Sequence, residues 1–332
     1  MYFTNKNNFF HGIMFHHFHD DRIHKKSQGS IDKDDLYNLI KYIGKKNILD
    51  AEDFYLRFKE KKLKNNHVCF TFDDAIKSQF DIALPVLDDL KIKAFFFITS
   101  SLLTRTPCLI EPTRYFRTFY FNTIEDFYDS FYTVLANLYT YNIDDFFLKN
   151  EKVISKKKKA IPIYTIQDIK FRLVRDHLLR ISEYENIILQ MFKEKKFNFN
   201  LIKENLFLSV DNLKTMMKLG HVIGLHSHTH PTFFENLSYE DQLSEYEKNI
   251  STLTEVLKIK KNELKYMSHP CGSYNNLTLD ILSKLDVKFG FRAKMTININ
   301  QGMKKINNSP LEIAREDHAV IIKMMNGSNS VS

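Results

Sequence analysis

The chain has 332 residues, which is enough for one large α/β domain or two small ones. Hydrophobic residues make up 43% of the sequence and charged residues 27%, as is usual for a globular protein. The net charge of +8 comes from lysines spread along the whole chain. A basic patch is what attracts nucleic acid, so we expect no nucleic-acid partner.

Cysteine usage and the N-terminal sequence bear on the cellular compartment. Three scattered cysteines without a C-x-x-C pair argue against a disulfide framework. No window approaches 18 apolar residues, and histidines interrupt the N-terminal apolar stretch, so neither a signal peptide nor a transmembrane segment is predicted. We therefore expect a cytoplasmic protein. The run Lys156 to Lys159 is expected to be solvated, with peripheral docking to an anionic membrane as the alternative.

The first third of the chain alternates strands and helices. Apolar runs predict strands over residues 9–18, 67–72 and 94–99, with helices over 32–43 and 76–90 between them. This order is typical of parallel α/β architectures.

The alternation stops between residues 102 and 205. Helical patterns occur at 124–138, 166–179 and 182–195, and no convincing strand separates them. We predict a helical insertion over one end of the sheet or barrel. Insertions of this length more often act as lids or recognition elements than as linkers.

The alternation resumes after residue 205. Strands are predicted over 221–225, 265–268 and 287–292, and a last one near 311–314. Helices are expected over 211–219, 239–257 and 276–285. The pattern predicts a single domain over residues 1–325, including the insertion at about 102–205, followed by a polar tail at 326–332.

Asp73 and Asp74 directly follow the predicted strand at 67–72. Neighbouring residues of a regular strand point to opposite faces, so both can serve one site only where the strand breaks. One carboxylate can then bind a metal ion, while its neighbour accepts a proton from a water molecule that the ion activates. The alternative interpretation is an ordinary helix N-cap with an acidic first turn.

His226 and His230 follow another predicted strand and are four residues apart. They can converge if the chain turns between them, as one helical turn would allow. Two imidazoles and one carboxylate with open positions form a catalytic metal site rather than a closed structural one. A polar surface cluster is the alternative. Sites in α/β barrels and open α/β sheets form at the carboxyl ends of strands, where both motifs fall.

The two motifs resemble those of one family, the polysaccharide deacetylases of the NodB-homology type (carbohydrate esterase family 4). Its T-F-D-D motif is similar to Thr71–Asp74, and its H-[S/T]-x-x-H-P motif is similar to His226–Pro231. A third segment, Ser268–Tyr274, resembles the Y-P-Y-G-S-Y variant of poly-N-acetylglucosamine deacetylases. The resemblance covers residues 10–100 and 206–318, and it implies a distorted (β/α)7 barrel of the α/β class.

The resemblance also implies a role for each motif. Asp73 would be the general base, and Asp74, His226 and His230 would bind one divalent metal ion. Zn²⁺ fits two histidines and one carboxylate, and Co²⁺, Ni²⁺ and Fe²⁺ use similar ligands. The third motif would contact the substrate, and the backbone N–H of Cys271 would help to hold the oxyanion. The expected substrate-binding residues are Pro270, Cys271, Gly272 and Tyr274.

Several positions depart from the family pattern. Ala75 stands where the family usually has Gly, and Ser268 stands where many members have an Arg that pairs with the base. Arg315 could take over that pairing. The family's late L-x-H motif, which supplies the general acid, has no clean match. His318 is the first candidate for the acid, followed by His269 and His16.

The sequence thus predicts a metal-dependent deacetylase that removes the N-acetyl group from an amino sugar. Because no signal peptide is predicted, the expected substrate is a surface-glycan precursor, which could be nucleotide-linked or lipid-linked. One alternative is removal of another acyl group, such as formyl, or action on a non-sugar amide. Another is a non-catalytic glycan-binding protein built on the same fold.

Overall fold

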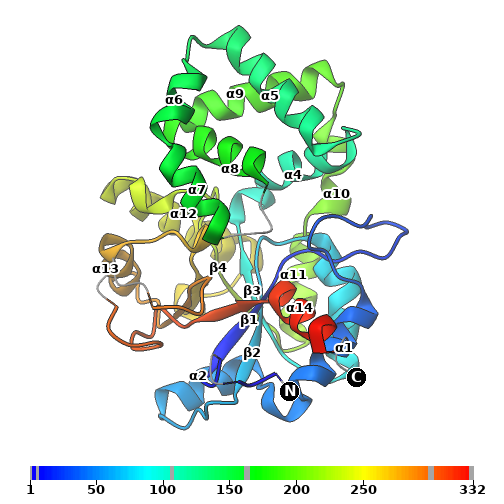
Figure 1. Ribbon diagram of the computed structural model, residues 1–332. Helices are drawn as coiled ribbons and strands as arrows, with labels where there is room; N and C mark the ends of the chain where they lie inside the picture. Colours follow the sequence, from blue (N-terminus) through cyan, green and yellow to red (C-terminus); the bar gives the residue numbers. More distant parts are fainter. Residues whose placement is uncertain (1, 5–6, 105–107, 161–164, 298–302, 329–332) are drawn as a thin grey trace. The chain divides into compact units, whose positions relative to one another are not determined.

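The computed structural model describes all residues except 1, 5–6, 105–107, 161–164, 298–302 and 329–332 (Figure 1). The chain forms two compact units. The first comprises Met1–Cys108 and Lys203–Ser332, and the second comprises Leu109–Ile202. No helix in the described part of the chain is long and apolar enough to cross a lipid bilayer.

The first unit is built on one parallel sheet. Every pairing between its neighbouring strands is parallel, and their spatial order is β6-β5-β4-β3-β2-β1-β7. The strands in the described residues are β1 (His11–Phe15), β2 (Val68–Phe72), β3 (Phe95–Ile98), β4 (Val222–Leu225), β5 (Tyr266–Ser268), β6 (Phe289–Phe291) and β7 (Arg315–Asp317). A sheet in which all strands are parallel is buried by other parts of the protein on both faces. This explains why its strands have continuous apolar sequences.

The segment before β7 brings the two edges of the sheet together. Its backbone bonds to β6, since the Arg292 N–H donates to the Ile313 carbonyl at 2.9 Å. It also bonds to β1, since the Gly12 N–H donates to the Ala314 carbonyl at 2.9 Å. The sheet is therefore a nearly closed barrel of seven parallel strands, which confirms the predicted distorted (β/α)7 barrel.

The position of the last strand was predicted wrongly. The apolar run at residues 311–314 makes only a bridge between Phe291 and Ile313, and β7 begins at Arg315, where it pairs with Gly12 of β1. Strand assignment depends on the pairing partner as much as on local composition. As a result, Arg315 lies within the strand instead of after it.

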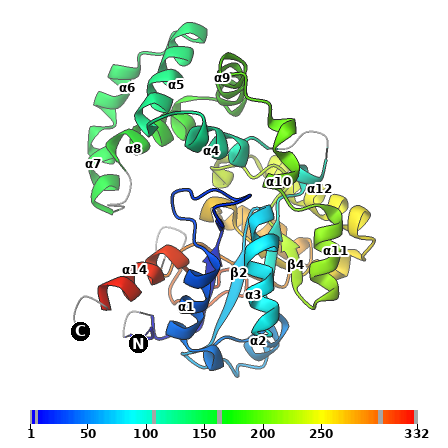
Figure 2. The same ribbon diagram turned by 90° about the vertical axis from the view of Figure 1, so that its right-hand side faces the viewer.

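Helices flank the strands of this unit. α1 packs against both α14 and α3, and Figure 2 shows it between these two helices at the outside of the strands. Asp32 caps α1 in a capping box, and Pro85 stands in the first turn of α3, where its missing N–H is tolerated. The helices are α1 (Lys33–Ile43), α2 (Ala51–Lys59), α3 (Leu84–Asp89), α10 (Lys203–Leu206), α11 (Val210–Lys218), α12 (Tyr239–Leu257), α13 (Asn276–Lys284) and α14 (His318–Ser328).

The expected polar tail, residues 326–332, is divided by the end of α14. Residues 326–328 continue that helix, and 329–332 lie outside the described residues.

The second unit is helical, and its helices are α4 (Ile110–Phe119), α5 (Ile124–Leu138), α6 (Ile143–Lys149), α7 (Glu151–Ala160), α8 (Ile166–Leu173) and α9 (Ile181–Glu194). Of these, α5, α8 and α9 correspond to the three helical patterns predicted for this stretch, whereas α4, α6 and α7 were not predicted. Aromatic rings fill its own core, with Phe116, Phe131 and Phe171 almost fully buried. The Tyr128 hydroxyl donates to the buried Asp168 carboxylate. Because this unit has a core of its own, much of the chain's aromatic content is used in packing.

Gly224 of β4 lets two neighbouring strands approach closely. A Cβ at this position would lie 2.7 Å from the Phe97 ring and 2.8 Å from the backbone oxygen of Tyr266. We therefore expect Gly224→Ala to lower the free energy of unfolding by about 1–3 kcal/mol, the usual cost of overpacking. Urea denaturation followed by circular dichroism measures this. Gly327→Ala is the control, because no atom lies within 4 Å of the added Cβ, and equal stability of the two variants would contradict the prediction.

Candidate active site

The candidate residues lie at the same end of four strands of the barrel. His16 follows β1, Asp73 follows β2, and His226 follows β4. Ser268 is the last residue of β5. Since the strands are parallel, these residues share one rim, where α/β barrels place their sites.

The chain turns sharply after β2, and the turn directs both carboxylates to one site. Asp74 and Ala75 have φ values of 73° and 55°, the left-handed region that favours glycine. This explains why a glycine suits the position of Ala75. The break in the strand confirms that Asp73 and Asp74 can face the same site, and both are buried.

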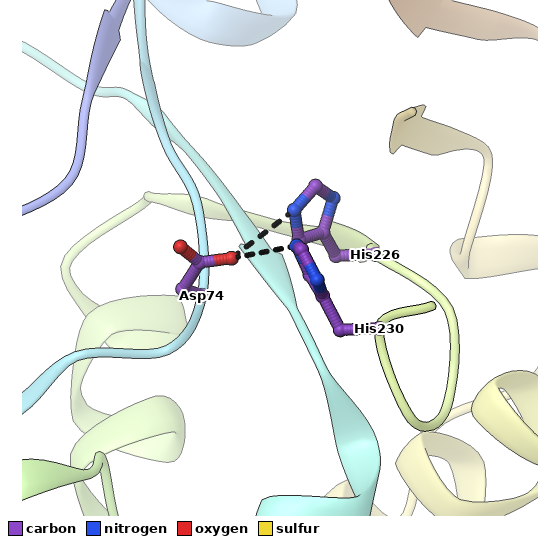
Figure 3. Close-up of side chains that lie close together, drawn as sticks. All are labelled: Asp74, His226 and His230. Atoms are coloured by element: carbon purple, nitrogen blue, oxygen red, sulfur yellow. Dashed lines mark ion pairs between the residues drawn. The ribbon is translucent and has the colours of Figure 1, made fainter. Parts of the chain in front are cut away.

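Asp74, His226 and His230 converge on one point (Figure 3). Asp74 Oδ1 lies 3.2 Å from His226 Nε2 and 3.2 Å from His230 Nε2, and the three atoms lie within 4.8 Å of one another. The turn between the histidines is not helical, because Ser227 and His230 both have left-handed backbone conformations. The Ser227 hydroxyl accepts the His230 N–H at 3.1 Å and holds this turn.

Ser268 fixes the orientation of the His226 ring. Nδ1 of His226 lies 2.9 Å from the Ser268 carbonyl oxygen, which can only accept a hydrogen bond. The Ser268 hydroxyl oxygen lies 2.7 Å from the same nitrogen, and because that hydroxyl donates to Asp73, both oxygens suit a protonated Nδ1, which leaves Nε2 to present a lone pair to Asp74. Metal-binding histidines are commonly oriented through such a bond to the other ring nitrogen.

The cluster has the properties expected of a cation site. Asp74 Oδ1 is buried and has no hydrogen-bond partner among the described residues, although two imidazole nitrogens face it. Lone pairs that converge without a proton between them repel one another, and a cation removes this repulsion. The 3.2 Å separations also resemble the distance of about 3.3 Å between ligands placed 2.0 Å from a tetrahedral Zn²⁺. The three residues therefore fit one divalent ion.

Charge coupling within the cluster is strong. Burial alone raises the pKa of Asp74, but His230 and His226 outweigh burial and hold that pKa well below its ordinary value. Burial alone lowers the pKa of His230, but the Asp74 carboxylate outweighs it and raises that pKa. Each partner thus stabilises the charged form of the other, as expected where opposite charges meet in a buried site.

Arg315 pairs with Asp73 through two contacts. Nη1 donates to Oδ1 and Nη2 lies next to Oδ2, both at 2.8 Å, and the two side chains are almost completely buried. The Ser268 hydroxyl also donates to Asp73 Oδ1 at 3.1 Å. Burial alone raises the pKa of Asp73, but Arg315, followed by His226, outweighs burial and lowers it. Asp73 is therefore ionised at neutral pH.

Gly12 makes room for this ion pair. β1 lies between β7, which carries Arg315, and β2, which leads to Asp73. A Cβ at Gly12 would lie 3.0 Å from Cγ of Arg315. The absence of a side chain thus lets the arginine pass over β1 to reach the carboxylate.

The expected substrate-binding residues form a turn after β5. Pro270–Gly272 is a short 3-10 turn, and Cys271 within it is exposed and has a φ of 52°. Tyr274 is different, because it is buried, it stacks on His269 with ring centroids 4.0 Å apart, and its hydroxyl donates to Glu312 at 2.9 Å. Cys271 in the turn is exposed at the rim, whereas Tyr274 is buried and packs against His269, which directly precedes the turn.

The chain is similar in sequence to one known protein family. A family model described as polysaccharide deacetylase matches residues 176–290 of the chain. The resemblance to the polysaccharide deacetylases is confirmed. The match includes the second and third motifs, while the first motif lies outside it, because residues 71–74 precede residue 176 in the sequence. No curated protein matches the chain.

Solved structures of polysaccharide deacetylases and related deacetylases share the fold. The Streptococcus pyogenes deacetylase PplD in complex with acetate is 15% identical, with a TM-score of 0.52 over 93% of this chain and 91% of that one. IcaB from Ammonifex degensii is 13% identical, with a TM-score of 0.52 and the same two coverages. A de-N-acetylase from Aggregatibacter actinomycetemcomitans is 13% identical, with a TM-score of 0.50 over 92% and 93%. The chain is thus similar in part of its sequence and in its fold to polysaccharide deacetylases.

The three acid candidates of this polysaccharide deacetylase fold lie in different surroundings. His318 is buried, with its ring nitrogens 3.1 Å and 2.9 Å from the carbonyl oxygens of Met14 and Gly29. His269 is also buried, its Nε2 lies 2.9 Å from the Leu311 carbonyl oxygen, and burial lowers its pKa to about 3. Neither ring is placed to give a proton to a substrate.

His16 alone of the three faces the carboxylates. Its Nε2 lies 4.0 Å from Asp73 Oδ2 and 3.9 Å from Asp74 Oδ2, and a quarter of the side chain is exposed. These distances exceed a hydrogen bond and leave the imidazole available. Gln79 holds the two segments together, because its Nε2 donates to the backbone oxygens of both His16 and Asp73.

Proposed function

We propose that this protein is a metal-dependent deacetylase that hydrolyses the N-acetyl group of an amino sugar in a surface-glycan precursor. The observation that carries this proposal is the Arg315-paired carboxylate of Asp73 next to the Asp74–His226–His230 cluster. A carboxylate base beside a buried cation site is an arrangement that can catalyse amide hydrolysis by an activated water molecule.

Asp74, His226 and His230 would hold the metal ion, and Zn²⁺ fits these ligands, as do Co²⁺, Ni²⁺ and Fe²⁺. When bound, such an ion lowers the pKa of water to about 7 and polarises the scissile carbonyl. Asp73 would accept the proton of the attacking water, and Arg315 orients the carboxylate and keeps it ionised. The backbone N–H of Cys271 in the exposed turn would donate to the oxyanion.

His16 would give the proton to the departing amine. We expect His16→Gln to lower kcat for an N-acetylated sugar by about 10²-fold, the lower end of the usual general-acid contribution. Acetate release and metal content should be measured together, and metal binding should persist. An activated ester such as 4-nitrophenyl acetate should be hydrolysed almost as fast as by the wild type, because its leaving group needs no proton.

The neighbouring His17→Gln provides the matched control for His16. It removes an imidazole from the same loop, and the His17 backbone oxygen still accepts its bond from Ile31. An unchanged kcat in His16→Gln, or an equal loss with amide and activated ester, would remove His16 from the mechanism.

The chemistry of the acyl group separates this proposal from its rivals. There are three alternative functions that the same fold would allow: removal of a formyl group, cleavage of a non-sugar amide, and glycan binding without catalysis. The test is to incubate the metal-loaded protein with N-acetylated sugars, N-formylated sugars and N-acetylated amino acids, and to quantify the acid released. Acetate from the sugars is the expected result. Formate alone would support removal of a formyl group, and no release from any compound would support glycan binding.

The nature of the sugar carrier and the location of the protein stay predictions. A nucleotide-linked or lipid-linked precursor and a cytoplasmic location follow from the sequence-based expectations given above. Peripheral membrane contact would be compatible with a lipid-linked precursor.

A further inference from the structure

Arg292 is a buried arginine, and the described residues use only part of the hydrogen-bonding capacity of its guanidinium. It directly follows β6 at the same end of the barrel as the candidate site, and only 3% of it is exposed. Nη1 donates to the Thr296 carbonyl, whereas Nε and Nη2 are buried and have no hydrogen-bond partner among the described residues. Buried donors of a charged group are costly to leave unpaired, so this edge of the guanidinium calls for an acceptor.

A cavity provides space for such an acceptor. It has a volume of about 270 Å³, and Arg292, Gly272, Lys294 and Thr296 are among the residues that line it. Lys294 is exposed and adds a second positive charge. Pockets for complete small molecules usually measure about 300–1,000 Å³. This cavity is therefore suited to one group of a larger ligand.

The acidic group that acts electrostatically on Arg292 does not form an ion pair with it. Glu312 and Tyr274 both act electrostatically on its guanidinium. Glu312, however, accepts the Tyr274 hydroxyl at 2.9 Å, and no carboxylate among the described residues forms an ion pair with Arg292. The cavity therefore keeps a positive character.

The cavity lies beside the candidate active site. The backbone oxygen of Arg292 accepts the Nε–H of Arg315 at 3.1 Å, and Arg315 in turn pairs with Asp73. Gly272 belongs to the same turn as Cys271. The Arg292 backbone and the turn that contains Gly272 and Cys271 thus connect the cavity to the candidate site.

We propose that this cavity binds an oxyanionic group, a phosphate or a carboxylate, that the amino-sugar substrate carries. Nε and Nη2 form one edge of the guanidinium, which matches two oxygens of such a group and favours it over a single hydroxyl. The exposed Lys294 would add attraction at the mouth of the cavity. The inference rests on the proposed function, since it places the anion on the substrate of that site.

The test compares three sugars that differ in charge: N-acetylglucosamine, N-acetylglucosamine 1-phosphate and N-acetylmuramic acid. For the metal-loaded wild type, we expect kcat/KM for acetate release to be at least about tenfold higher for one charged sugar than for the neutral one. Which charged sugar is preferred distinguishes phosphate from carboxylate. Arg292→Met should lower that preference about tenfold, mainly by raising KM for the charged sugar.

Two further variants make this result specific. Lys294 is exposed, so Lys294→Met should not impair folding. It should lower the preference for the charged sugar by about threefold. Arg57→Met is the matched control, because Arg57 pairs with Asp53 on the surface of α2, and it should keep the wild-type preference. A wild type without preference for either charged sugar, or a preference retained in both Arg292→Met and Lys294→Met, would overturn the proposal.

Binding to the metal-free protein separates this proposal from the proposed function. Isothermal titration calorimetry with the same three sugars requires no turnover. Tighter binding of a charged sugar that depends on Arg292 would support the subsite even if no acetate were ever released, in which case only the deacetylase proposal would fail. Equal binding of all three sugars would overturn the subsite and leave deacetylation untouched.

Discussion

Asp73→Asn is expected to lower kcat for acetate release by about 10²–10⁴-fold, because Asn cannot accept the proton of the attacking water. Metal binding should persist, since none of the three ligand atoms that form the cation site belongs to Asp73. The variant also leaves the buried Arg315 without its partner. Removal of one member of a buried ion pair costs about 3–5 kcal/mol, so the melting temperature should fall as well.

A double variant separates the effect on catalysis from the effect on stability. Asp73→Asn combined with Arg315→Met removes both charges and should recover part of the lost stability. Activity should stay as low as in Asp73→Asn. Acetate release and thermal unfolding measured on the wild type, both single variants and the double variant complete the cycle. Activity within tenfold of the wild type in Asp73→Asn would remove the base from the mechanism.

Asp74→Ala is expected to abolish metal binding and, with it, acetate release. Residues that only orient a metal ligand change metal affinity by about 10–100-fold, so loss of a direct ligand should weaken binding by more than about 100-fold. A ligand that binds only the folded protein stabilises it by about 2.7 kcal/mol at a concentration of 100 Kd. Zn²⁺ should therefore raise the melting temperature of the wild type, but not that of Asp74→Ala.

The matched control for Asp74 is another aspartate that contacts a histidine. Asp81 Oδ2 lies 2.8 Å from His24 Nε2, and Oδ1 accepts from Lys77. Asp81→Ala breaks these contacts but should retain the stabilisation by Zn²⁺ and the activity. If Asp74→Ala bound Zn²⁺ as tightly as Asp81→Ala, the ligand assignment would be wrong.

Local patterns were sufficient to predict most of the barrel from the sequence. Buried parallel strands have continuous apolar sequences, and the runs ending at Phe72, Ile98 and Leu225 lie within a residue or two of the expected ends. The segment before β7 shows the limit of this reasoning. Its apolar residues suit a strand, but the chain pairs with β1 only from Arg315 onwards, and that choice depends on a neighbour distant in sequence.

The site was predictable where chemistry and strand ends coincide. Asp74, His226 and His230 each lie after a strand, and parallel strands bring them to one rim, although their convergence also needs the left-handed turns at Asp74 and Ser227. His16 follows β1 in the same way, and the pairing of Phe15 with Phe72 places it beside Asp73. The sequence signal was therefore present, but the adjacency of β1 and β2 was needed to rank His16 above His318.

Arg315 and Arg292 mark two further limits. Contact between Arg315 and Asp73 depends on the missing side chain of Gly12, a steric detail of three adjacent strands. The unpaired edge of Arg292 depends on there being no acceptor for it among the residues that the structure describes. Neither condition follows from composition, periodicity or motif spacing.

Asp73 is proposed to act as the base for water that hydrolyses an N-acetyl group. The reaction takes place beside a cation held by Asp74, His226 and His230. The most direct measurement is acetate release from an N-acetylated amino sugar by the chelator-treated protein as Zn²⁺ is added back in steps. Acetate release should rise in proportion to bound Zn²⁺ and reach its maximum at one equivalent. Release that does not depend on added metal, or no release at one bound equivalent for any N-acetylated sugar, would contradict the claim.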